Sequence, residues 1–587
     1  MTTDYDVCVI GSGAGGGPVA YELAKAGYAV VVLEKGPWYT EKDFYKDEIA
    51  CCRRNAYASN TLDEPQVVES HEERDAWWAR STYQSGWTFW NGNCVGGSSN
   101  FMSGYFHRLK PMDFRLLSEF GPIEGANIVD WPISYEDMEP YYDKVERVVG
   151  VSGRVHKHRY AEPRSSEQFA YPATVDHPMG RHIEAACDAL GMDAITAPRA
   201  ILSRPKGRRR GCNYSGYCGS YGCATSAKGS SRAALLNDAV ETGNCDVRPH
   251  AMVSRLISDA KGKVIAAEYF DADGKVQRVT AKIFNVACQA VESARLLLRS
   301  TGPRYPQGLA NDSGQVGRNL IFAAGGAASG RVTYEKFGQE LASFGPFINR
   351  AVQDYYVIDD KDFGPRQKGG TIDFDFQPPS AIARASYLVT DSNGLVWGER
   401  LKQRLEQHFL RGQYIKVEAF CDWLPIDDCH IRLSSHQKDK WGLPVSHVKV
   451  DYHAHNLRTG WYLADKGGSV LREMGAEDVT AFAVGSPPTN LQAGTCRFGD
   501  DAESSVLDAD CRSHEAENLF VSDGSFMPNG GSVQHTWTIY ANAFRVADNI
   551  RAQLGGGVRT SSQAQTRRFS QPMQWRPIKA ANGDTQS

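Results

Sequence analysis

The chain has 587 residues, of which 41% are hydrophobic and 23% are charged, and its formal net charge at pH 7 is −4. A chain of this length is too long to enclose a single core, so two or more packed domains are expected. The net charge is close to zero and shows no excess of basic residues, so nucleic acid is not an expected partner. No uninterrupted apolar run approaches the ~20 residues of a membrane-spanning helix.

The first informative stretch covers residues 5–35. An apolar, β-branched run predicts a buried strand, a glycine-rich segment follows, and a helical pattern then ends at Gly27. A second apolar run over 29–33 ends at Glu34. Strand, glycines, helix, strand and acid in this order are typical of a βαβ unit that binds a dinucleotide.

Each glycine of the segment has a distinct mechanical role. Gly11 permits the tight turn, Gly13 lets the backbone approach a pyrophosphate, and Gly16 allows the helix to pack closely on the strand. The helix start offers free N–H groups and the positive end of its dipole. Glu34 can accept a hydrogen bond from a ribose hydroxyl, which favours FAD or NAD over NADP. A tight-turn βαβ unit without a ligand is the alternative.

A second glycine-rich segment, residues 91–102, reads NGNCVGGSSNFM. It suggests a backbone that approaches a flat ligand, although a surface turn has a similar composition. Together with the N-terminal fingerprint, this segment resembles the glucose-methanol-choline (GMC) oxidoreductase family. The resemblance implies that Gly96, Gly97, Ser98 and Asn100 lie beside the pyrophosphate and ring of FAD. Members with covalent flavin have a histidine shortly after the two glycines; its absence here implies noncovalent FAD.

The resemblance also implies the fold, which combines a Rossmann-like α/β FAD-binding domain with a discontinuous α+β substrate domain built on an antiparallel sheet. The region of Val253 would lie near the adenine. Strand-like runs, including 430–433 and 445–450, and one long helix favour an α+β arrangement in the second domain. The expected divisions are 1–324 for the FAD-binding domain, 325–480 for the substrate-binding domain, 481–555 for a return to the FAD domain, and 556–587 for a C-terminal tail.

Three cysteines, Cys212, Cys218 and Cys223, fall within twelve residues of a glycine-rich loop at about 205–230. Thiolates at this spacing suit an iron–sulfur cluster or zinc, whereas free thiols, or a disulfide plus one thiol, are the alternative without metal. In the GMC family, the catalytic subunits of fructose, glucose and gluconate dehydrogenases carry a cysteine-rich segment here, which implies a cluster. Because Ser215 stands where a fourth ligand would be expected, the cluster would be [3Fe–4S], or [4Fe–4S] with an outside ligand.

The last hundred residues are expected to carry the chemistry. Residues 494–499 resemble the GTCRMG element of the family, and 518–525 resemble its second FAD motif, with Asp523 near the ribityl or phosphate groups. The family pairs a histidine with a second histidine or an asparagine beside the flavin N5. The resemblance implies His535, at the start of the last helix, as the base that takes the alcohol proton, and Asn490 as its partner.

Both catalytic assignments leave alternatives open. Strict matching of the family pattern would put Gln534 on the helix-start position, and a lone histidine can simply cap a helix. No histidine lies just before Thr495, and Gln492 or Gln534 could take the place of Asn490.

The resemblance implies an FAD-dependent dehydrogenase that oxidises a secondary alcohol of a sugar or glycoside, such as C3 of a glucoside. Electrons would pass through the cluster to a cytochrome c. Relatives of this kind often work with a small chaperone-like subunit whose twin-arginine signal carries the flavoprotein to the periplasm; a cytoplasmic location is the alternative. An oxidase that uses O₂ and a non-catalytic FAD-binding subunit are the competing functions.

Overall fold

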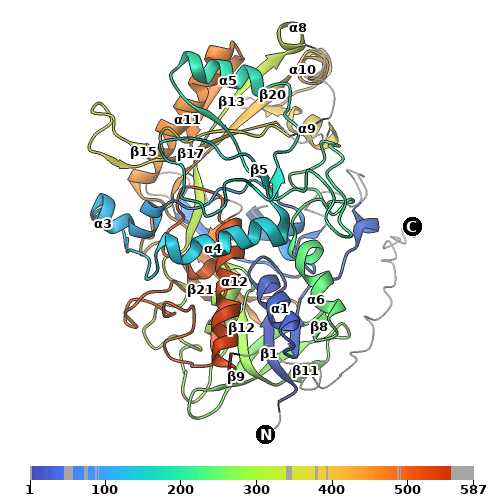
Figure 1. Ribbon diagram of the computed structural model, residues 1–587, viewed down its shortest axis with the longest axis vertical. Helices are drawn as coiled ribbons and strands as arrows, with labels where there is room; N and C mark the ends of the chain where they lie inside the picture. The colour runs from blue at the N-terminus through green and yellow to red at the C-terminus, as the bar shows by residue number, and fades with distance from the viewer. Residues whose placement is uncertain are drawn as a thin grey trace.

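The computed structural model describes residues 3–44, 57–71, 77–85, 89, 91–338, 341, 345, 347–376, 381–391, 394–485, 488 and 491–556. Figure 1 shows a domain with a parallel sheet at the bottom and a domain with an antiparallel sheet at the top. The chain passes between them several times, so neither domain is one continuous segment.

The lower domain is built on a five-stranded parallel sheet in the order β25-β12-β1-β2-β8. Its strands are β1 (Tyr5–Ile10), β2 (Val30–Leu33), β8 (Cys245–Arg248), β12 (Ala281–Val286) and β25 (Leu519–Val521). Every residue of β1 and β2 is buried, as expected where helices cover both faces of a parallel sheet. The predicted βαβ unit is present, with α1 (Gly16–Lys25) between its first two strands.

Other elements complete this domain. Helix α1 packs against α12 (Thr536–Gln553), so segments from opposite ends of the sequence lie side by side (Figure 1). A three-stranded antiparallel sheet, formed by β9 (Met252–Ser258), β10 (Val264–Phe270) and β11 (Val276–Val279), packs on α7 (Ala290–Arg299).

The upper domain is built on a seven-stranded antiparallel sheet, ordered β23-β13-β20-β17-β14-β7, with β24 pairing to β13. The strands are β7 (Ala194–Thr196), β13 (Ile321–Thr333), β14 (Arg350–Val352), β17 (Gly370–Phe376), β20 (Gly412–Asp422), β23 (Glu477–Ala483) and β24 (Gln492–Ala493). The long helix α11 (Ala454–Met474) covers the sheet closely because two glycines meet there. A Cβ on Gly326 would lie 2.1 Å from the carbonyl oxygen of Gly460.

Two strands lie elsewhere than the sequence pattern indicates. The runs 430–433 and 445–450 become part of β21 (His430–Lys438) and β22 (Pro444–Lys449), which join β3 (Val67–His71) and β4 (Trp77–Ser81) in a separate four-stranded sheet. This sheet packs on α7 of the lower domain. Composition identifies a strand, whereas its partners depend on which core receives its apolar face.

Conversely, a segment that lies within the range expected for the FAD-binding domain belongs to the upper domain. Strand β7 and helix α5 (Gly180–Ala189) belong to the upper domain, where α5 packs on α11. The remaining helices are α2 (Thr82–Ser85), α3 (Leu116–Phe120), α4 (Tyr135–Val145), α6 (Asn237–Glu241), α8 (Tyr334–Phe337), α9 (Ala381–Tyr387) and α10 (Gly398–Phe409). The remaining strands are β5 (Ser152–Gly153), β6 (Tyr171–Pro172), β15 (Val357–Ile358), β16 (Gln367–Lys368), β18 (Thr390–Asp391) and β19 (Gly394–Leu395).

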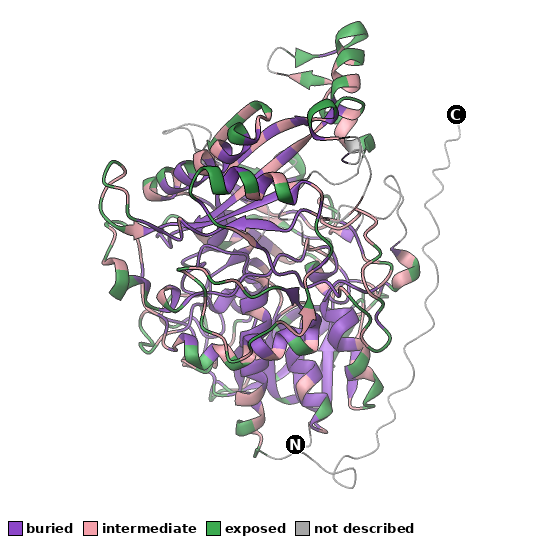
Figure 2. Cartoon of the chain, turned by 45° about the horizontal axis from the view of Figure 1, so that its top comes forward, coloured by how far each residue is buried: buried purple, intermediate pink, exposed green. Residues whose placement is uncertain are grey.

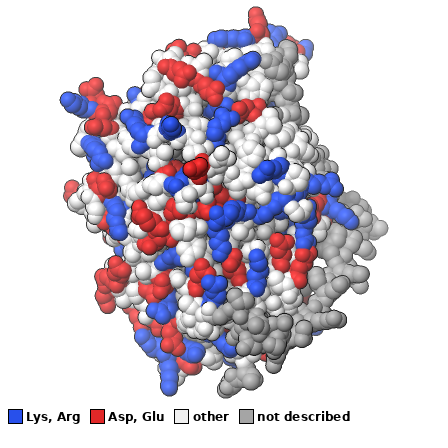
Figure 3. Space-filling view, in the orientation of Figure 1, with Lys and Arg blue, Asp and Glu red and all other residues white. Residues whose placement is uncertain are grey.

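Buried residues concentrate in the two sheets and the helices that cover them, while α10 and the β18–β19 hairpin are largely exposed (Figure 2). On the face in Figure 3, basic and acidic side chains are interspersed, with a short row of basic side chains across the middle. Among the helices described, none is long and apolar enough to cross a membrane.

Candidate active site

A cavity of about 630 Å³ lies between the two domains. The lower domain contributes the turn after β1, the end of β2 and the start of α7. The upper domain contributes β13 and β20, and the start of α12 closes one end. The glycine segments and the C-terminal motifs singled out from the sequence therefore meet at one place.

The first glycine segment forms one wall of this cavity. Gly11 has φ +94°, and a Cβ there would lie 2.2 Å from the carbonyl oxygen of Ala287. A Cβ on Gly16 would lie 2.0 Å from the carbonyl oxygen of Gly11, so this glycine sets the close approach of α1 to β1. Gly13 lines the cavity and has open space where its Cβ would project. All three glycines have positions that suit the roles expected from the sequence.

Glu34 lies on the same wall, just after β2. Its Oε2 accepts hydrogen bonds from the backbone N–H of Ser12 (3.2 Å) and the hydroxyl of Ser12 (2.5 Å), and its Oε1 accepts from the N–H of Gly36 (2.9 Å). Burial raises the pKa of Glu34, although these bonds oppose the shift. Ser12 Oγ also accepts from the N–H of Gly96 at 2.9 Å, which ties the two glycine segments together.

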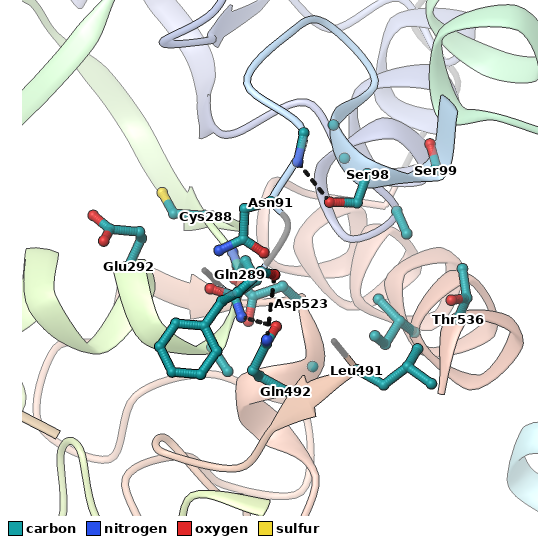
Figure 4. A pocket seen from close by; sticks show the side chains of 18 of the residues that line it. Asn91, Ser98, Ser99, Cys288, Gln289, Glu292, Leu491, Gln492, Asp523 and Thr536 are labelled. Carbon is teal, nitrogen blue, oxygen red and sulfur yellow. Dashed lines mark hydrogen bonds between the residues drawn. The ribbon is translucent and has the colours of Figure 1, made fainter. Parts of the chain in front are cut away.

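Some residues of the second glycine segment line the cavity, and another supports the turn that this segment forms. Gly97 and Ser98 line the cavity, and Figure 4 shows the side chain of Ser98 there. Gly96 and Gly97 have φ of +91° and +55°, which form the turn. Asn100 is buried outside the cavity lining, where its Nδ2 donates to the carbonyl oxygens of Val95 (2.9 Å) and Gly97 (3.1 Å). Asn100 therefore supports the turn from behind.

Val253 and Asp523 also line the cavity. Asp523 follows β25, and its Oδ2 accepts from the N–H of Gln289 at 2.9 Å and from the hydroxyl of Ser293. Burial raises the pKa of Asp523, and its hydrogen bonds lower it. A Cβ on Gly15 would lie 2.7 Å from Asp523 Cα. Gly15 was not singled out from the sequence, although it belongs to the same glycine-rich run.

At the start of α12 the cavity is lined by Gln534 and Thr536, and His535 is outside the lining. The His535 ring is fully buried, and burial lowers its pKa to about 4. The ring lies beside the backbone of Gly530 and Leu491. His535 therefore does not line the cavity, whereas Gln534, the alternative left open above, does.

Of the residues before Thr495 that could pair with the residue at the start of α12, the structure describes only some. Asn490 lies outside the described residues. Gln492, on β24, lines the cavity, and its Oε1 accepts from Gln289 Nε2 at 2.5 Å. Figure 4 shows Gln289, Gln492 and Asp523 grouped at the cavity, with Leu491 and Thr536 nearby. Gln289, which has φ +80° and caps α7, is a further cavity residue that the sequence pattern did not reveal.

The three cysteines of the glycine-rich loop line a second, smaller cavity of about 50 Å³, together with Arg199 and Lys228. All three are free thiols. Arg199 Nη2 lies 3.5 Å from Cys218 Sγ, and the Lys228 backbone N–H donates to Cys223 Sγ at 3.5 Å. Burial raises the pKa of Cys212; for Cys223 burial acts likewise, but Lys228 and local hydrogen bonds bring its pKa below the usual value.

The three sulfurs do not form a site for a single metal ion. In the described part of the chain, the one group whose ligand atoms all lie within 4.8 Å of one another is His158, Asp193 and Asp354. Tetrahedral zinc with Zn–S bonds of about 2.3 Å needs sulfurs closer than this.

One backbone segment separates the two cavities. Ser103 lines the large cavity, and its carbonyl oxygen accepts from Cys218 Sγ at 3.6 Å and from the Arg199 guanidinium. The N–H of Ser220 donates to the carbonyl oxygen of Phe101 at 2.8 Å. The cysteine loop therefore packs directly on the outer side of the segment that lines the large cavity.

Comparison with known proteins places these features in a family. The chain matches the N- and C-terminal models of the GMC oxidoreductases over residues 78–322 and 425–543. It is 31% identical to 2-methyl-1,2-propanediol dehydrogenase of Mycolicibacterium austroafricanum, over 94% of this chain and 96% of that protein. It is 32% identical to paromamine 6'-oxidase of Streptomyces fradiae, over 94% and 92%.

More distant likenesses agree. The chain is 26% identical to the fructose dehydrogenase large subunit of Gluconobacter japonicus, over 95% of this chain and 99% of that protein. A solved structure of formate oxidase from Aspergillus oryzae has a TM-score of 0.62 at 15% identity, covering 94% of this chain and 99% of that one. The fold class and the family resemblance expected from the sequence are both confirmed.

Proposed function

Because the chain belongs to the GMC oxidoreductase family, we propose that it is a dehydrogenase that oxidises a secondary alcohol of a sugar or glycoside, such as C3 of a glucoside, and exports the electrons through an iron–sulfur cluster to a cytochrome c. Family membership itself makes it an FAD-dependent oxidoreductase of CH–OH groups. The substrate, the cluster and the acceptor are the proposal.

The large cavity fits FAD. Open space at Gly13 leaves room for the pyrophosphate, Glu34 offers carboxylate oxygens for the ribose hydroxyls, and Val253 would contact the adenine. Ser98 and Asp523 would hold the middle of the cofactor. When bound, FAD accepts the hydride that leaves the substrate carbon.

The upper wall of the cavity suits a substrate with several hydroxyl groups. Residues 323–327 of β13 are alanine or glycine, so their small side chains leave space. Gln492, Gln534, Lys416 and Glu418 place amide and charged groups on the lining, and these can bond hydroxyls. The names of the relatives refer to a diol, an aminoglycoside and a sugar, which supports a polyhydroxyl substrate.

The contact between Cys218 and the carbonyl oxygen of Ser103 is the observation that carries electron export. It brings the cysteine cavity against the segment that lines the FAD cavity. Cys212, Cys218 and Cys223 would hold the cluster, with Arg199 and Lys228 beside them. A small twin-arginine subunit that carries the protein to the periplasm is part of the proposal, supported by the family resemblance.

The test combines spectroscopy with replacement of the cysteines. We expect iron and an electron paramagnetic resonance signal in the protein purified with its co-expressed neighbours. The triple variant C212S/C218S/C223S should lose both, keep flavin reduction by methyl α-D-glucoside within about twofold, and reduce cytochrome c at least about a hundredfold more slowly. Cys187→Ser, a buried cysteine of the upper core, is the matched control.

Two results would overturn parts of this proposal. Iron-free protein whose reduced flavin is reoxidised rapidly by air would establish the oxidase, an activity named for the Streptomyces relative. Flavin that no sugar or glycoside reduces, tested with methyl α-D-glucoside, D-fructose and D-gluconate, would remove the sugar assignment.

A further inference from the structure

One face of the upper sheet packs on α11, and the other face looks onto the large cavity. Ala328 on β13 and Val417 on β20 are a cross-strand pair, and both belong to the core that α11 covers. Side chains alternate along a strand, so the adjacent pair, Ala327 and Glu418, lies on the opposite face. Both residues of that pair line the cavity. The register therefore assigns each residue of these strands to one face or the other.

Phe482, on the edge strand β23, belongs to the cavity face. It pairs with Ala327, and directly opposed residues of antiparallel strands place their side chains on the same face. Its neighbours agree with this assignment, since Ala481 packs against the core under α11 and Val484, two residues further on, lines the cavity. One row of side chains thus crosses the sheet from Phe482 through Ala327 to Glu418.

This row is accessible to solvent at the edge of the cavity. Phe482 is 55% exposed, and the side chains of Glu418 and Lys416 are 46% and 44% exposed. Ala327 stands between Phe482 and Glu418 and has only a methyl group, so the aromatic ring and the carboxylate border a small residue. Because Ala327, Glu418 and Lys416 all line the cavity, a ligand on this row is continuous with a ligand inside the cavity.

The next row of the same face adds polar groups. Ser329 pairs with Lys416 on one side and with Thr480 on the other, and the two hydroxyl groups lie 3.1 Å apart. Lys416 also lies 3.5 Å from Glu418, and so accessible an ion pair contributes little to stability, so its atoms can bond a ligand at small cost. A sugar presents C–H bonds that pack on an aromatic ring and hydroxyl groups that bond polar side chains, and this surface offers both.

We propose that Phe482, Glu418 and Lys416 form a subsite for the second ring of a glycoside, which projects from the cavity while the first ring is oxidised inside it. The inference rests on the proposed oxidation of a glycoside, and it adds that the preferred substrates carry a sugar or aromatic ring on the anomeric oxygen. That ring would pack on Phe482, and its polar substituents would bond Glu418 and Lys416. Phe482 is thus a specificity residue that contacts no reacting atom.

The test compares methyl α-D-glucoside with phenyl α-D-glucoside, which differ only in the group on the anomeric oxygen. In wild type, kcat/KM should be about tenfold higher for the phenyl glucoside, mostly through KM, because the contact is the same before and during hydride transfer. Phe482→Ala should reduce this ratio to below about two, whereas Phe482→Tyr, which keeps a ring, should preserve it. Trp461→Ala is the matched control, because Trp461 is 53% exposed on α11, across the sheet from the cavity, and its loss should leave the ratio unchanged.

A ratio near one in wild type would overturn the inference. So would a ratio that Phe482→Ala leaves unchanged, or one that Trp461→Ala lowers equally. A general defect in folding would affect both glucosides alike and would not move the ratio. The FAD content and the unfolding temperature of each variant are measured alongside.

A second measurement does not depend on turnover, so it separates this inference from the proposed function. After reduction by dithionite without oxygen, the flavin cannot accept a hydride, and calorimetry reports binding alone. The Kd of the phenyl glucoside should be about tenfold below that of the methyl glucoside in wild type, and the two should agree within about twofold in Phe482→Ala.

The outcomes of this measurement differ for the two proposals. Equal Kd values in wild type would overturn the subsite even if methyl α-D-glucoside reduces the flavin. The expected difference in Kd would support the subsite even if neither glucoside were oxidised, a result that would remove the proposed function. Absence of binding by either glucoside would overturn both.

Discussion

Just before α12, two neighbouring residues have different surroundings: the side chain of Gln534 lies on the cavity wall, and that of His535 is buried in the protein. Both residues precede α12, which begins at Thr536, and only one of the two lines the cavity. Gln534 reaches the cavity, whereas His535 is enclosed near the backbone of Gly530 and Leu491. The histidine is chemically the more attractive base, yet it does not line the cavity.

Replacing different glycines of the first segment by alanine should have different effects. Gly16→Ala should damage folding, because its Cβ would lie 2.0 Å from the carbonyl oxygen of Gly11. Gly13→Ala should fold normally, because its Cβ meets nothing, but it should weaken FAD binding at least about tenfold, since the methyl group enters the cavity. Thermal unfolding of the apoproteins and FAD titration measure the two effects. Equal FAD affinity of Gly13→Ala and wild type would contradict the placement.

His535 predicts a pH dependence of stability. Its pKa is about 4 in the folded protein and about 6.5 when unfolded. The contribution of neutral His535 to the free energy of unfolding is therefore complete above pH 6.5. It is lost as the pH falls towards 4, because in that range only the unfolded chain takes up a proton at this residue. Between pH 7.5 and 5, wild type should lose about 2 kcal/mol more unfolding free energy than His535→Asn. Urea unfolding at both pH values tests this, and parallel losses would contradict it.

At the scale of elements, a buried ion pair fastens the β21–β22 turn to the lower domain. Arg295 on α7 lies 2.6 Å from Asp439, and both side chains are nearly inaccessible. Arg295 also donates to the carbonyl oxygen of Pro444 at 2.8 Å, and the N–H of Lys440 donates to the carbonyl oxygen of Asp63 at 2.7 Å. These contacts explain why two strands encoded between β20 and α11 belong to the lower domain.

Asp439→Asn should therefore destabilise the protein by about 3 kcal/mol, because it leaves a buried guanidinium with less compensation. The loss of unfolding free energy should be moderate, because Arg295 keeps its ion pair with Glu292, at 3.0 Å. Asp428→Asn is the control, because its carboxylate is 59% exposed in its pair with Lys449 and should contribute less than about 1 kcal/mol. Chemical unfolding compares them, and equal losses in the two variants would refute the anchoring role.

At the scale of the whole molecule, the cavity joins the two domains. Its walls come from the parallel sheet below and from β13 and β20 above, so a ligand in it contacts both. The cysteine loop lies against the same cavity wall through Ser103. A ligand that fills this cavity is therefore part of the interface between the two domains.

Removal of FAD should consequently lower the unfolding temperature and separate the unfolding of the domains. Free FAD at a hundredfold excess over its Kd stabilises the folded state by about 2.7 kcal/mol. We expect one calorimetric transition for the holoprotein and two for the apoprotein. A single transition at an unchanged temperature in the apoprotein would show that the domains are held together without the cofactor.

The sequence by itself determined the features that depend on local order. The strand, glycines, helix and acid of residues 5–35 identify a dinucleotide unit because each part acts on its neighbours in the chain. The second glycine segment and the C-terminal motifs then identified the family and the fold.

Only the tertiary structure decided what depends on contacts distant in sequence. The partners of β21 and β22, the enclosure of His535 and the bond between Gln534 and Asp373 each join segments more than a hundred residues apart or depend on which face is covered. Nothing local distinguishes Asp373 from Asp375 on β17. The difference arises from packing, because the Asp373 carboxylate meets Gln534 and His107, which are distant in sequence.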